Sequence, residues 1–309
     1  MPKMPVLTKE QYGNIYALLA ILFWSSTFAV GRTVTEQLGT IRSTAYMYLI
    51  GGLFGMILFY TRAEKRAALF NLSSRFYIYC GFFFILFSFS LYSSIGFALN
   101  RTQMVEVGLI NYLWPSLTII FAIPLHKLKA RWWIVLGMLL ATYGISLSAN
   151  RGASLNFAEL IVHAQQNLFS YGLAFLAAIS WALYSNLTKL YAPNGGDQAI
   201  PIFVFLAGIT FLCFSVFVPE RSIWDLHVLT ELVFLALVPT CFAYIFWSRA
   251  LQHGNLVIIS ALSYATPLLA SIFSCLYLSI EFTQDIFFGA IAVILGSVIC
   301  SKSVVNHKK

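Results

Sequence analysis

Ten apolar stretches, each close to the length of a bilayer-spanning helix, constrain this chain more than any other feature. They lie at roughly 13–31, 44–61, 76–98, 104–125, 132–149, 170–191, 199–219, 229–251, 255–280 and 284–301, and a helix crosses a membrane in about 20 residues. Charged residues make up 10% of the chain, against about 25% in a typical soluble protein. Because backbone polar groups in lipid need internal partners and no alternating barrel pattern occurs, the sequence predicts an all-α integral membrane protein with ten transmembrane helices.

Lys and Arg are distributed unevenly between the two ends of these spans. If the N-terminus is cytoplasmic, five of the 19 face outwards, namely Arg32, Arg42, Arg101, Arg151 and Arg221. The other 14 then face the cytoplasm, as the positive-inside rule requires, so both termini are predicted to be cytoplasmic. The net charge of +8 has the same explanation. Because the sequence shows no basic domain outside the bilayer, it does not indicate nucleic-acid binding.

A constant offset of 152 residues relates the two halves of the chain. It matches Tyr92 with Tyr244, Ala98 with Ala250, Leu99 with Leu251, Tyr112 with Tyr264, Pro115 with Pro267, Gly137 with Gly289 and Gly144 with Gly296. Each half holds five spans, an odd number, so the second half is inserted upside down relative to the first. The sequence thus predicts two inverted five-helix repeats around a central cavity, with repeats at 1–150 and 170–309 and a link at 151–169. The paired glycines are expected to allow close helix packing.

Span four carries the densest group of polar and aromatic residues at mid-membrane depth. Asn111 and Pro115 share a helix face, and Tyr112 and Trp114 flank it. Pro115 removes one helix hydrogen bond, and its repeat partner Pro267 does the same in span nine. One interpretation is a pair of broken helices that line the cavity. The alternative is that the two prolines only shape the packing of the bundle.

Two tryptophans lie near the middle of their spans rather than at the membrane interfaces. Trp24 and Trp181 are matched at an offset of 157 residues, and each indole N–H needs a partner at that depth, which a polar cavity would supply. Tyr184 lies one turn beyond Trp181 and could share its face. The alternative is ordinary packing, because aromatic residues make up 17% of the chain.

Glu106 is the best candidate for a membrane-embedded acid, and hence for proton coupling. However, it lies in the first turn of span four, and its side chain points roughly 120° away from Asn111 and Tyr112 on ideal helix geometry. A local pairing role is therefore the alternative. The five histidines and five cysteines show no metal-ligand spacing, and no nucleophile or nucleotide-binding motif occurs, so neither an enzyme nor a metal or cofactor site is indicated.

The pattern as a whole resembles the drug/metabolite transporter superfamily, in its EamA-type branch. The likeness rests on the five-plus-five repeat, the early Trp in spans one and six, and the Pro in spans four and nine. The segment QMVEVGLINYLWPSLTIIFAI (Gln103–Ile123) is similar, more narrowly, to the YddG-type aromatic amino-acid exporters of that branch. The resemblance implies a basket-like ten-helix bundle in the bacterial inner membrane, open to the outside, with an apolar and aromatic cavity. Tyr112 and Trp114 match the motif best, followed by Trp181 and Tyr92.

We therefore predict a transporter that exports amino acids, aromatic or bulky apolar ones, by alternating access. The predicted substrate-binding residues are Tyr112, Trp114, Trp181, Tyr92, Asn111, Trp24, Tyr184 and Tyr264. The expected partners are the amino acid and the lipid bilayer, and ten spans suffice to enclose a cavity in a monomer. An EamA-type exporter of another small metabolite or a drug-like cation is the alternative within transport. A membrane-embedded enzyme or a receptor is the alternative outside it.

Overall fold

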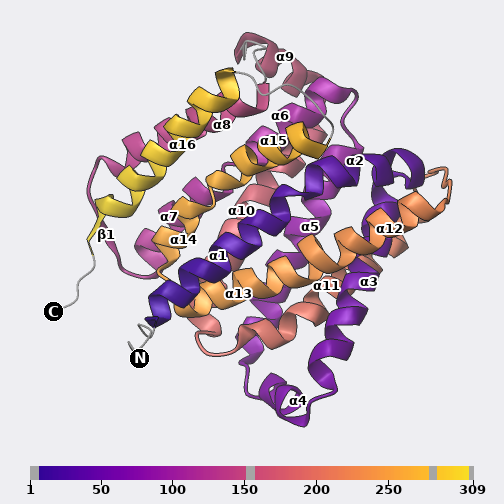
Figure 1. Cartoon of the computed structure of the whole chain (residues 1–309), viewed down its shortest axis with the longest axis horizontal. Coiled ribbons are helices and arrows are strands. Elements are labelled where there is room, and N and C mark those ends of the chain that lie inside the picture. Colours follow the sequence, from indigo (N-terminus) through magenta and orange to yellow (C-terminus); the bar gives the residue numbers. More distant parts are fainter. Residues whose placement is uncertain (1–6, 151–156, 278–283, 306–309) are drawn as a thin grey trace, which may run out of the picture.

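The computed structural model describes residues 7–150, 157–277 and 284–305 as a helical bundle (Figure 1). Its first part comprises α1 (Lys9–Ser25), α2 (Thr27–Leu38), α3 (Thr40–Tyr60), α4 (Ala63–Phe70), the π-helix η1 (Phe76–Cys80), α5 (Gly81–Gly96), α6 (Arg101–Asn111), α7 (Trp114–Leu125) and α8 (Ile134–Asn150). Its second part comprises α9 (Phe157–Gln166), α10 (Leu168–Tyr191), the 3-10 helix η2 (Gly196–Ala199), α11 (Ile200–Ser215), α12 (Leu226–Leu235), the π-helix η3 (Ala236–Phe242), α13 (Ala243–His253), α14 (Leu256–Leu262), α15 (Ala265–Tyr277) and α16 (Gln284–Ser303). Two short strands, β1 (Lys129–Ala130) and β2 (Val304–Val305), pair antiparallel beside α16.

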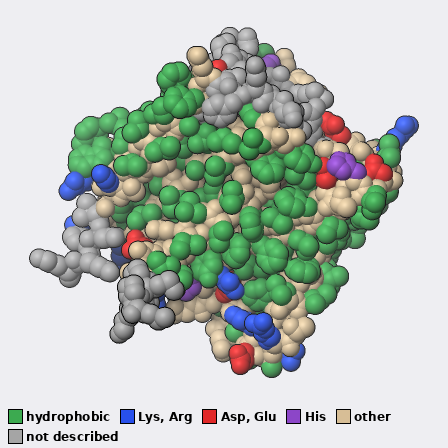
Figure 2. Space-filling model, viewed as in Figure 1, with side chains coloured by type: hydrophobic (Ala, Val, Ile, Leu, Met, Phe, Trp, Pro, Cys, Tyr) green, Lys and Arg blue, Asp and Glu red, His purple; other side chains and the backbone are tan. Residues whose placement is uncertain are grey.

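Within the described residues, eight helical stretches are long and apolar enough to cross a membrane. They are Lys9–Gly31, Thr40–Tyr60, Phe76–Gly96, Glu106–Leu125, Leu168–Tyr191, Gly196–Ser215, Leu226–His253 and Leu256–Tyr277, and the two shorter apolar helices are Ile134–Leu147 and Phe287–Ser303. Hydrophobic side chains cover the middle of the face in Figure 2, and charged side chains gather towards its edges. These observations confirm the all-α membrane class. The start of α1 and the end of α16 lie on the same side of the bundle (Figure 1).

Two helices occur between spans where none was predicted. The surface helix α4 follows α3, and α9 occupies part of the predicted link at 151–169. The next helix, α10, begins at Leu168, two residues before the predicted start of span six. Both short helices lie in polar stretches of sequence, which carry no apolar run of membrane length.

Polar side chains cap several helix N-termini and so fix where the helices begin. The Thr8 hydroxyl accepts from the Gln11 amide at 3.2 Å, and the Gln11 side chain accepts from the Thr8 amide at 2.7 Å, which closes a capping box before α1. Asn100 caps α6, and Asp225 caps α12 by accepting from the amide of Val228 at 2.7 Å. These caps satisfy amides that would otherwise lack partners at the membrane boundary.

Glycines allow α8 and α16 to pack closely along their length (Figure 1). A Cβ atom added to Gly144 would lie 2.6 Å from the carbonyl oxygen of Gly289, and one added to Gly137 would lie 2.9 Å from that of Gly296. No side chain fits at either contact. The predicted role of the repeated glycines in close helix packing is confirmed.

The longest helix contacts join the first half of the chain to the second. The helix α3 packs against α11, α5 packs against α10, and α1 packs against α13. The α3–α11 pair is close enough that a Cβ atom on Gly208 would lie 2.7 Å from the amide nitrogen of Leu49. The space between the halves is therefore bounded by helices of both.

Candidate functional site

A cavity of about 480 Å³ lies between the helices of the two halves. It is lined by Thr27, Gly31, Val34, Thr35, Glu36, Thr40, Ser43, Thr44, Met47, Leu91, Tyr92, Ile95, Met104, Gly108, Asn111, Tyr112, Leu232 and Leu235. The exposed members of this lining, Glu36 and Met104, lie near the α2–α3 turn and the start of α6. The cavity therefore opens at the end of the bundle opposite to the start of α1.

A break in span four brings two predicted residues to the cavity wall. The helix α6 ends at Asn111, Tyr112 and Leu113 form a turn, and α7 begins at Trp114 with Pro115 in its first turn. Because Pro115 has no N–H, the Asn111 carbonyl lacks its α-helical partner, and the chain can turn at this point. Asn111 and Tyr112 both line the cavity.

Span nine is interrupted at the corresponding place, where the Ser263 hydroxyl and carbonyl have partners but the buried Thr266 hydroxyl has none among the described residues. The helix α14 ends at Leu262, α15 begins at Ala265, and Pro267 lies in the first turn of α15. The Ser263 hydroxyl donates to the Ser260 carbonyl at 2.6 Å, and the Thr266 amide donates to the Ser263 carbonyl at 3.0 Å. The two breaks thus share their position in the repeat and differ in the groups that they leave open.

A cluster of aromatic rings is centred on Trp181 of α10. The rings within 6.1 Å of its centroid belong to Phe87 at 4.5 Å, Tyr184 at 5.0 Å, Trp24 and Tyr244 at 5.6 Å, and Trp114 and Trp247 at 6.1 Å. Most of these contacts are tilted or edge-on, the geometries that aromatic pairs prefer. The cluster draws rings from α1, α5, α7, α10 and α13, and hence from both halves.

Hydrogen bonds fix two tryptophans of this cluster, Trp24 and Trp247. The Trp24 indole donates to the carbonyl of Pro239 in η3 at 3.1 Å, and the Trp247 indole donates to the Ser185 hydroxyl at 3.2 Å. The N–H of the half-buried Trp24 thus finds its partner on a π-helix of the other half rather than on a cavity wall. Such a partner was not evident from the sequence.

A tyrosine pair joins the cavity to the ring cluster. The hydroxyls of Tyr48 and Tyr244 lie 2.7 Å apart, and the Tyr48 ring meets the Tyr92 ring edge-on at 5.8 Å. Tyr92 lines the cavity, whereas Tyr244 belongs to the cluster. The inner end of the cavity is therefore continuous with the aromatic rings.

The predicted site residues fall into three groups in the structure. Tyr92, Asn111 and Tyr112 line the cavity, and Trp24, Trp114, Trp181 and Tyr184 belong to the ring cluster. Tyr264 is buried with its hydroxyl 2.6 Å from that of Ser116, away from the cavity lining. No pattern in the sequence selected Tyr48, Phe87 or Trp247, and Tyr244 was indicated only as the repeat partner of Tyr92.

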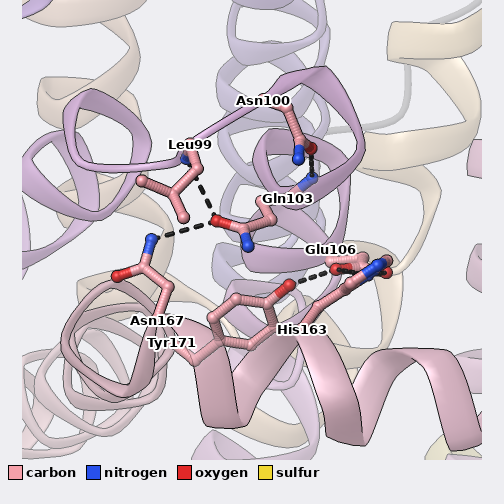
Figure 3. Close-up of polar contacts among 7 residues, drawn as sticks. All are labelled: Leu99, Asn100, Gln103, Glu106, His163, Asn167 and Tyr171. Carbon is pink, nitrogen blue, oxygen red and sulfur yellow. Dashed lines mark hydrogen bonds and ion pairs between the residues drawn. The ribbon is translucent and has the colours of Figure 1, made fainter.

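Glu106 belongs to a separate polar network around the N-terminal half of α6 (Figure 3). Its carboxylate accepts a hydrogen bond from the Tyr171 hydroxyl, and the His163 ring nitrogen Nδ1 lies 3.0 Å from Oε1. Beside it, the Gln103 side-chain oxygen accepts from Asn167 and from the Leu99 amide, each at 3.0 Å. This network ties α6 to α9 and α10, and Glu106 is not among the cavity-lining residues.

These contacts favour the pairing role for Glu106 over proton coupling. We expect Glu106→Gln to keep its transport rate within about twofold of wild type, which corresponds to less than about 0.5 kcal/mol. Glutamine keeps an acceptor for the Tyr171 hydroxyl, and the cavity lining is unchanged because it does not include Glu106. The measurement is the rate at which proteoliposomes take up labelled substrate, with and without a pH gradient. A coupling acid would behave differently, because its neutral variant would lose the response to the gradient.

The opposite end of the bundle is closed by polar contacts. The Asp197 carboxylate is 6% exposed and lies 3.0 Å from Arg249 Nε, and the Arg249 guanidinium packs over the Tyr16 ring at 5.7 Å. The Lys189 ammonium donates to the Gly254 carbonyl at 2.8 Å. These contacts join α1, α10, η2 and α13 at the end of the bundle away from the cavity mouth.

Titratable groups elsewhere add no metal site to this picture. Across residues 7–150, 157–277 and 284–305, no three His, Cys, Asp or Glu side chains gather closely enough to hold a metal ion.

At the closed end, burial and the nearby Lys189 ammonium lower the pKa of His126 below its ordinary value. His126 is therefore neutral at pH 7.

The chain matches one transporter family in sequence and a protein of known structure in fold. The profile of the EamA-like transporter family matches residues 11–150 and again residues 168–302. The aromatic amino acid exporters YddG of Salmonella typhimurium and of Escherichia coli are 35% and 33% identical over 94% of this chain and 97% of their own length. A protein of known crystal structure that is 20% identical has the same fold, with a TM-score of 0.79 over 95% of this chain and 97% of that protein.

Proposed function

Because the chain belongs to the EamA-like transporter family, we propose that it exports aromatic amino acids by alternating access. Two curated relatives with more than 30% identity over nearly the whole chain carry the name aromatic amino acid exporter. The aromatic residues in and beside the cavity of this chain support the same substrate class, independently of the names of those relatives. We place the protein in the bacterial inner membrane, because these relatives come from bacteria.

The observation that carries the proposal is a cavity whose wall contains tyrosine rings that connect, through Tyr48, to the aromatic cluster around Trp181, which we call the floor. Its volume of about 480 Å³ falls within the range of roughly 300–1,000 Å³ that is usual for small-molecule sites. Tyr92 and Tyr112 present rings to the cavity, and Tyr48 connects Tyr92 to the cluster around Trp181. Offset and edge-on ring contacts favour a substrate that carries a ring of its own.

Within this site we assign direct substrate contact to Tyr92, Asn111 and Tyr112. Trp24, Trp114, Trp181 and Tyr184 form the floor on which the side chain of the substrate stacks once the site closes around it. Tyr264 has a supporting role, because its hydroxyl pairs with Ser116 on the helix that follows the break. Pro115 and Pro267 set the two points at which α6–α7 and α14–α15 can bend.

The pattern of helix contacts supports an inverted repeat. Exchanging the halves turns the α1–α13 contact into the α10–α5 contact, and it turns the α3–α11 and α8–α16 contacts into themselves. A two-fold axis in the membrane plane produces such a pairing. The two family matches, at 11–150 and 168–302, support repeats at 1–150 and 170–309 joined by the link at 151–169.

The orientation follows from the excess of Lys and Arg on the side of the chain termini. With both termini in the cytoplasm, the cavity opens to the outside, and the contacts of Asp197, Arg249 and Lys189 close the cytoplasmic end. Export then requires the two halves to rock, so that the outer mouth closes and the inner contacts separate.

A counterflow assay with the reconstituted full chain tests the proposal. Proteoliposomes loaded with unlabelled phenylalanine, tyrosine or tryptophan should accumulate the labelled forms, and vesicles loaded with alanine, glutamate or lysine should show little exchange. Vesicles without protein provide the background. If aromatic amino acids give no exchange above that background while another metabolite or a drug-like cation does, the substrate assignment is wrong.

A further inference from the structure

The α3 wall of the cavity carries hydroxyls whose protons are already used. The Thr44 hydroxyl donates to the Thr40 carbonyl at 2.6 Å, and the Ser43 hydroxyl donates to the same carbonyl at 3.1 Å. Both side chains line the cavity and are at least 97% buried. The described part of the chain gives neither hydroxyl a second partner. Since a hydroxyl has one donor and two lone pairs, what each offers to the cavity is acceptors.

The amides at the start of α3 are also committed. Glu220 accepts from the Ile41 amide at 2.9 Å and from the Arg42 amide at 2.8 Å. A helix N-terminus would otherwise attract a carboxylate. Here that place is filled by a carboxylate of the chain itself, so these two amides are not available to a second anion.

We propose that Ser43 and Thr44 form the subsite that accepts hydrogen bonds from the α-ammonium group of the substrate. The inference rests on the proposed function, in which this cavity binds an amino acid. An ammonium group brings three donors and no acceptor, which is the complement of this wall.

The geometry along α3 fits a single amino acid. Tyr48 lies four residues beyond Thr44, about 6 Å further along the helix axis, and its ring contacts that of Tyr92. An ammonium group held at Thr44 therefore leaves the ring of the same molecule within reach of Tyr92. The head group sits nearer the mouth and the ring nearer the floor.

Three competitors of labelled phenylalanine uptake into proteoliposomes distinguish recognition of the ammonium group from recognition of the carboxylate. They are phenylalanine itself, 2-phenylethylamine, which lacks the carboxylate, and 3-phenylpropanoate, which lacks the ammonium. In the Ser43→Ala/Thr44→Val double variant, we expect the half-inhibitory concentrations of phenylalanine and 2-phenylethylamine to rise about tenfold or more, the loss typical of a hydrogen bond to a charged group. The value for 3-phenylpropanoate should change less than about twofold.

Two variants serve as controls. Thr44→Ser keeps the hydroxyl and should lose much less affinity than Thr44→Val. Thr210→Val removes a hydroxyl that makes the same bond to the carbonyl four residues earlier, at 3.0 Å on α11, outside the cavity lining. It should behave as wild type. Size-exclusion chromatography in detergent establishes that each variant is folded, and each single substitution replaces the double variant if the latter is not.

The outcomes are distinct. If the double variant weakens 3-phenylpropanoate and spares 2-phenylethylamine, the hydroxyls act as donors to the carboxylate, and the subsite assignment is overturned. Unchanged inhibition by all three competitors overturns it as well. Both results leave aromatic export standing, because wild-type flux is intact in them. An absence of phenylalanine flux in the wild type overturns the proposed function and the subsite together.

Discussion

Replacing Trp181 with alanine should abolish aromatic amino-acid transport and lower the thermal stability of the protein. Trp181 is 2% exposed, and its ring lies within 6.1 Å of six others. Truncating a buried Trp to alanine typically costs about 3–5 kcal/mol, because the removed ring leaves a cavity. The floor of the candidate site would collapse or fill with lipid or water. The measurements are counterflow with labelled tryptophan and the unfolding temperature in detergent.

Two further variants separate a binding role for Trp181 from a packing role. Trp181→Phe keeps a ring and should regain most of the stability, but it should raise the KM for tryptophan, because the contact area of the floor is smaller. Trp132→Ala removes a ring that is 72% exposed and should change neither measurement. Wild-type KM in a destabilised Trp181→Ala protein would show that the cluster is only part of the core.

Residues that depend on local geometry could be identified from the sequence. Asn111, Tyr112 and Tyr92 reach the cavity because helix periodicity and the repeat offset define which residues share a depth and a face. The break before Pro115 has the same local origin, since a missing amide acts on its own helix. The EamA-type resemblance, which rests on the five-plus-five repeat, the early Trp of spans one and six and the Pro of spans four and nine, is confirmed by the family match.

Residues that depend on packing between the halves could not be identified. Tyr48, Phe87 and Trp247 carry no motif, and they meet the site only because α3, α5 and α13 converge there. The partner of Trp24 depends on the π-helix η3, an irregularity with no periodic signature in an apolar run. The sequence could place a Trp at mid-membrane depth but not the carbonyl that receives its proton.

Glu106 combines an orientation that the sequence could predict with hydrogen-bond partners that it could not. Helix geometry indicated that it faces away from Asn111, and the structure places it outside the cavity lining. Its partners could not be foreseen, because His163 lies on α9, a helix within the predicted link, and Tyr171 lies on α10. A buried acid in a span therefore suggested coupling more strongly than its surroundings support.

Removing the Arg249 side chain should open the closed end of the bundle. Asp197 is 6% exposed and Arg249 is 30% exposed, so Arg249→Ala leaves a buried carboxylate without its cation. Breaking a buried ion pair in this way costs about 3–5 kcal/mol, and the partial exposure of Arg249 places this pair at the lower end. Because the cost applies only while the end is closed, the equilibrium should shift towards the inward-open form, by about 100-fold for a loss near 3 kcal/mol.

Chemical labelling at the closed end measures this shift. Ser248 is fully buried beside Gln252, so Ser248→Cys in a Cys213→Ser background should react slowly with a maleimide and much faster once Arg249→Ala is added. The charge-reversed pair Asp197→Arg/Arg249→Asp should restore slow labelling, since it restores the attraction with opposite sign. Arg66→Ala removes an exposed cation on α4 and should have no effect. Slow labelling and wild-type counterflow in Arg249→Ala would mean that the Asp197–Arg249 ion pair does not hold this end shut.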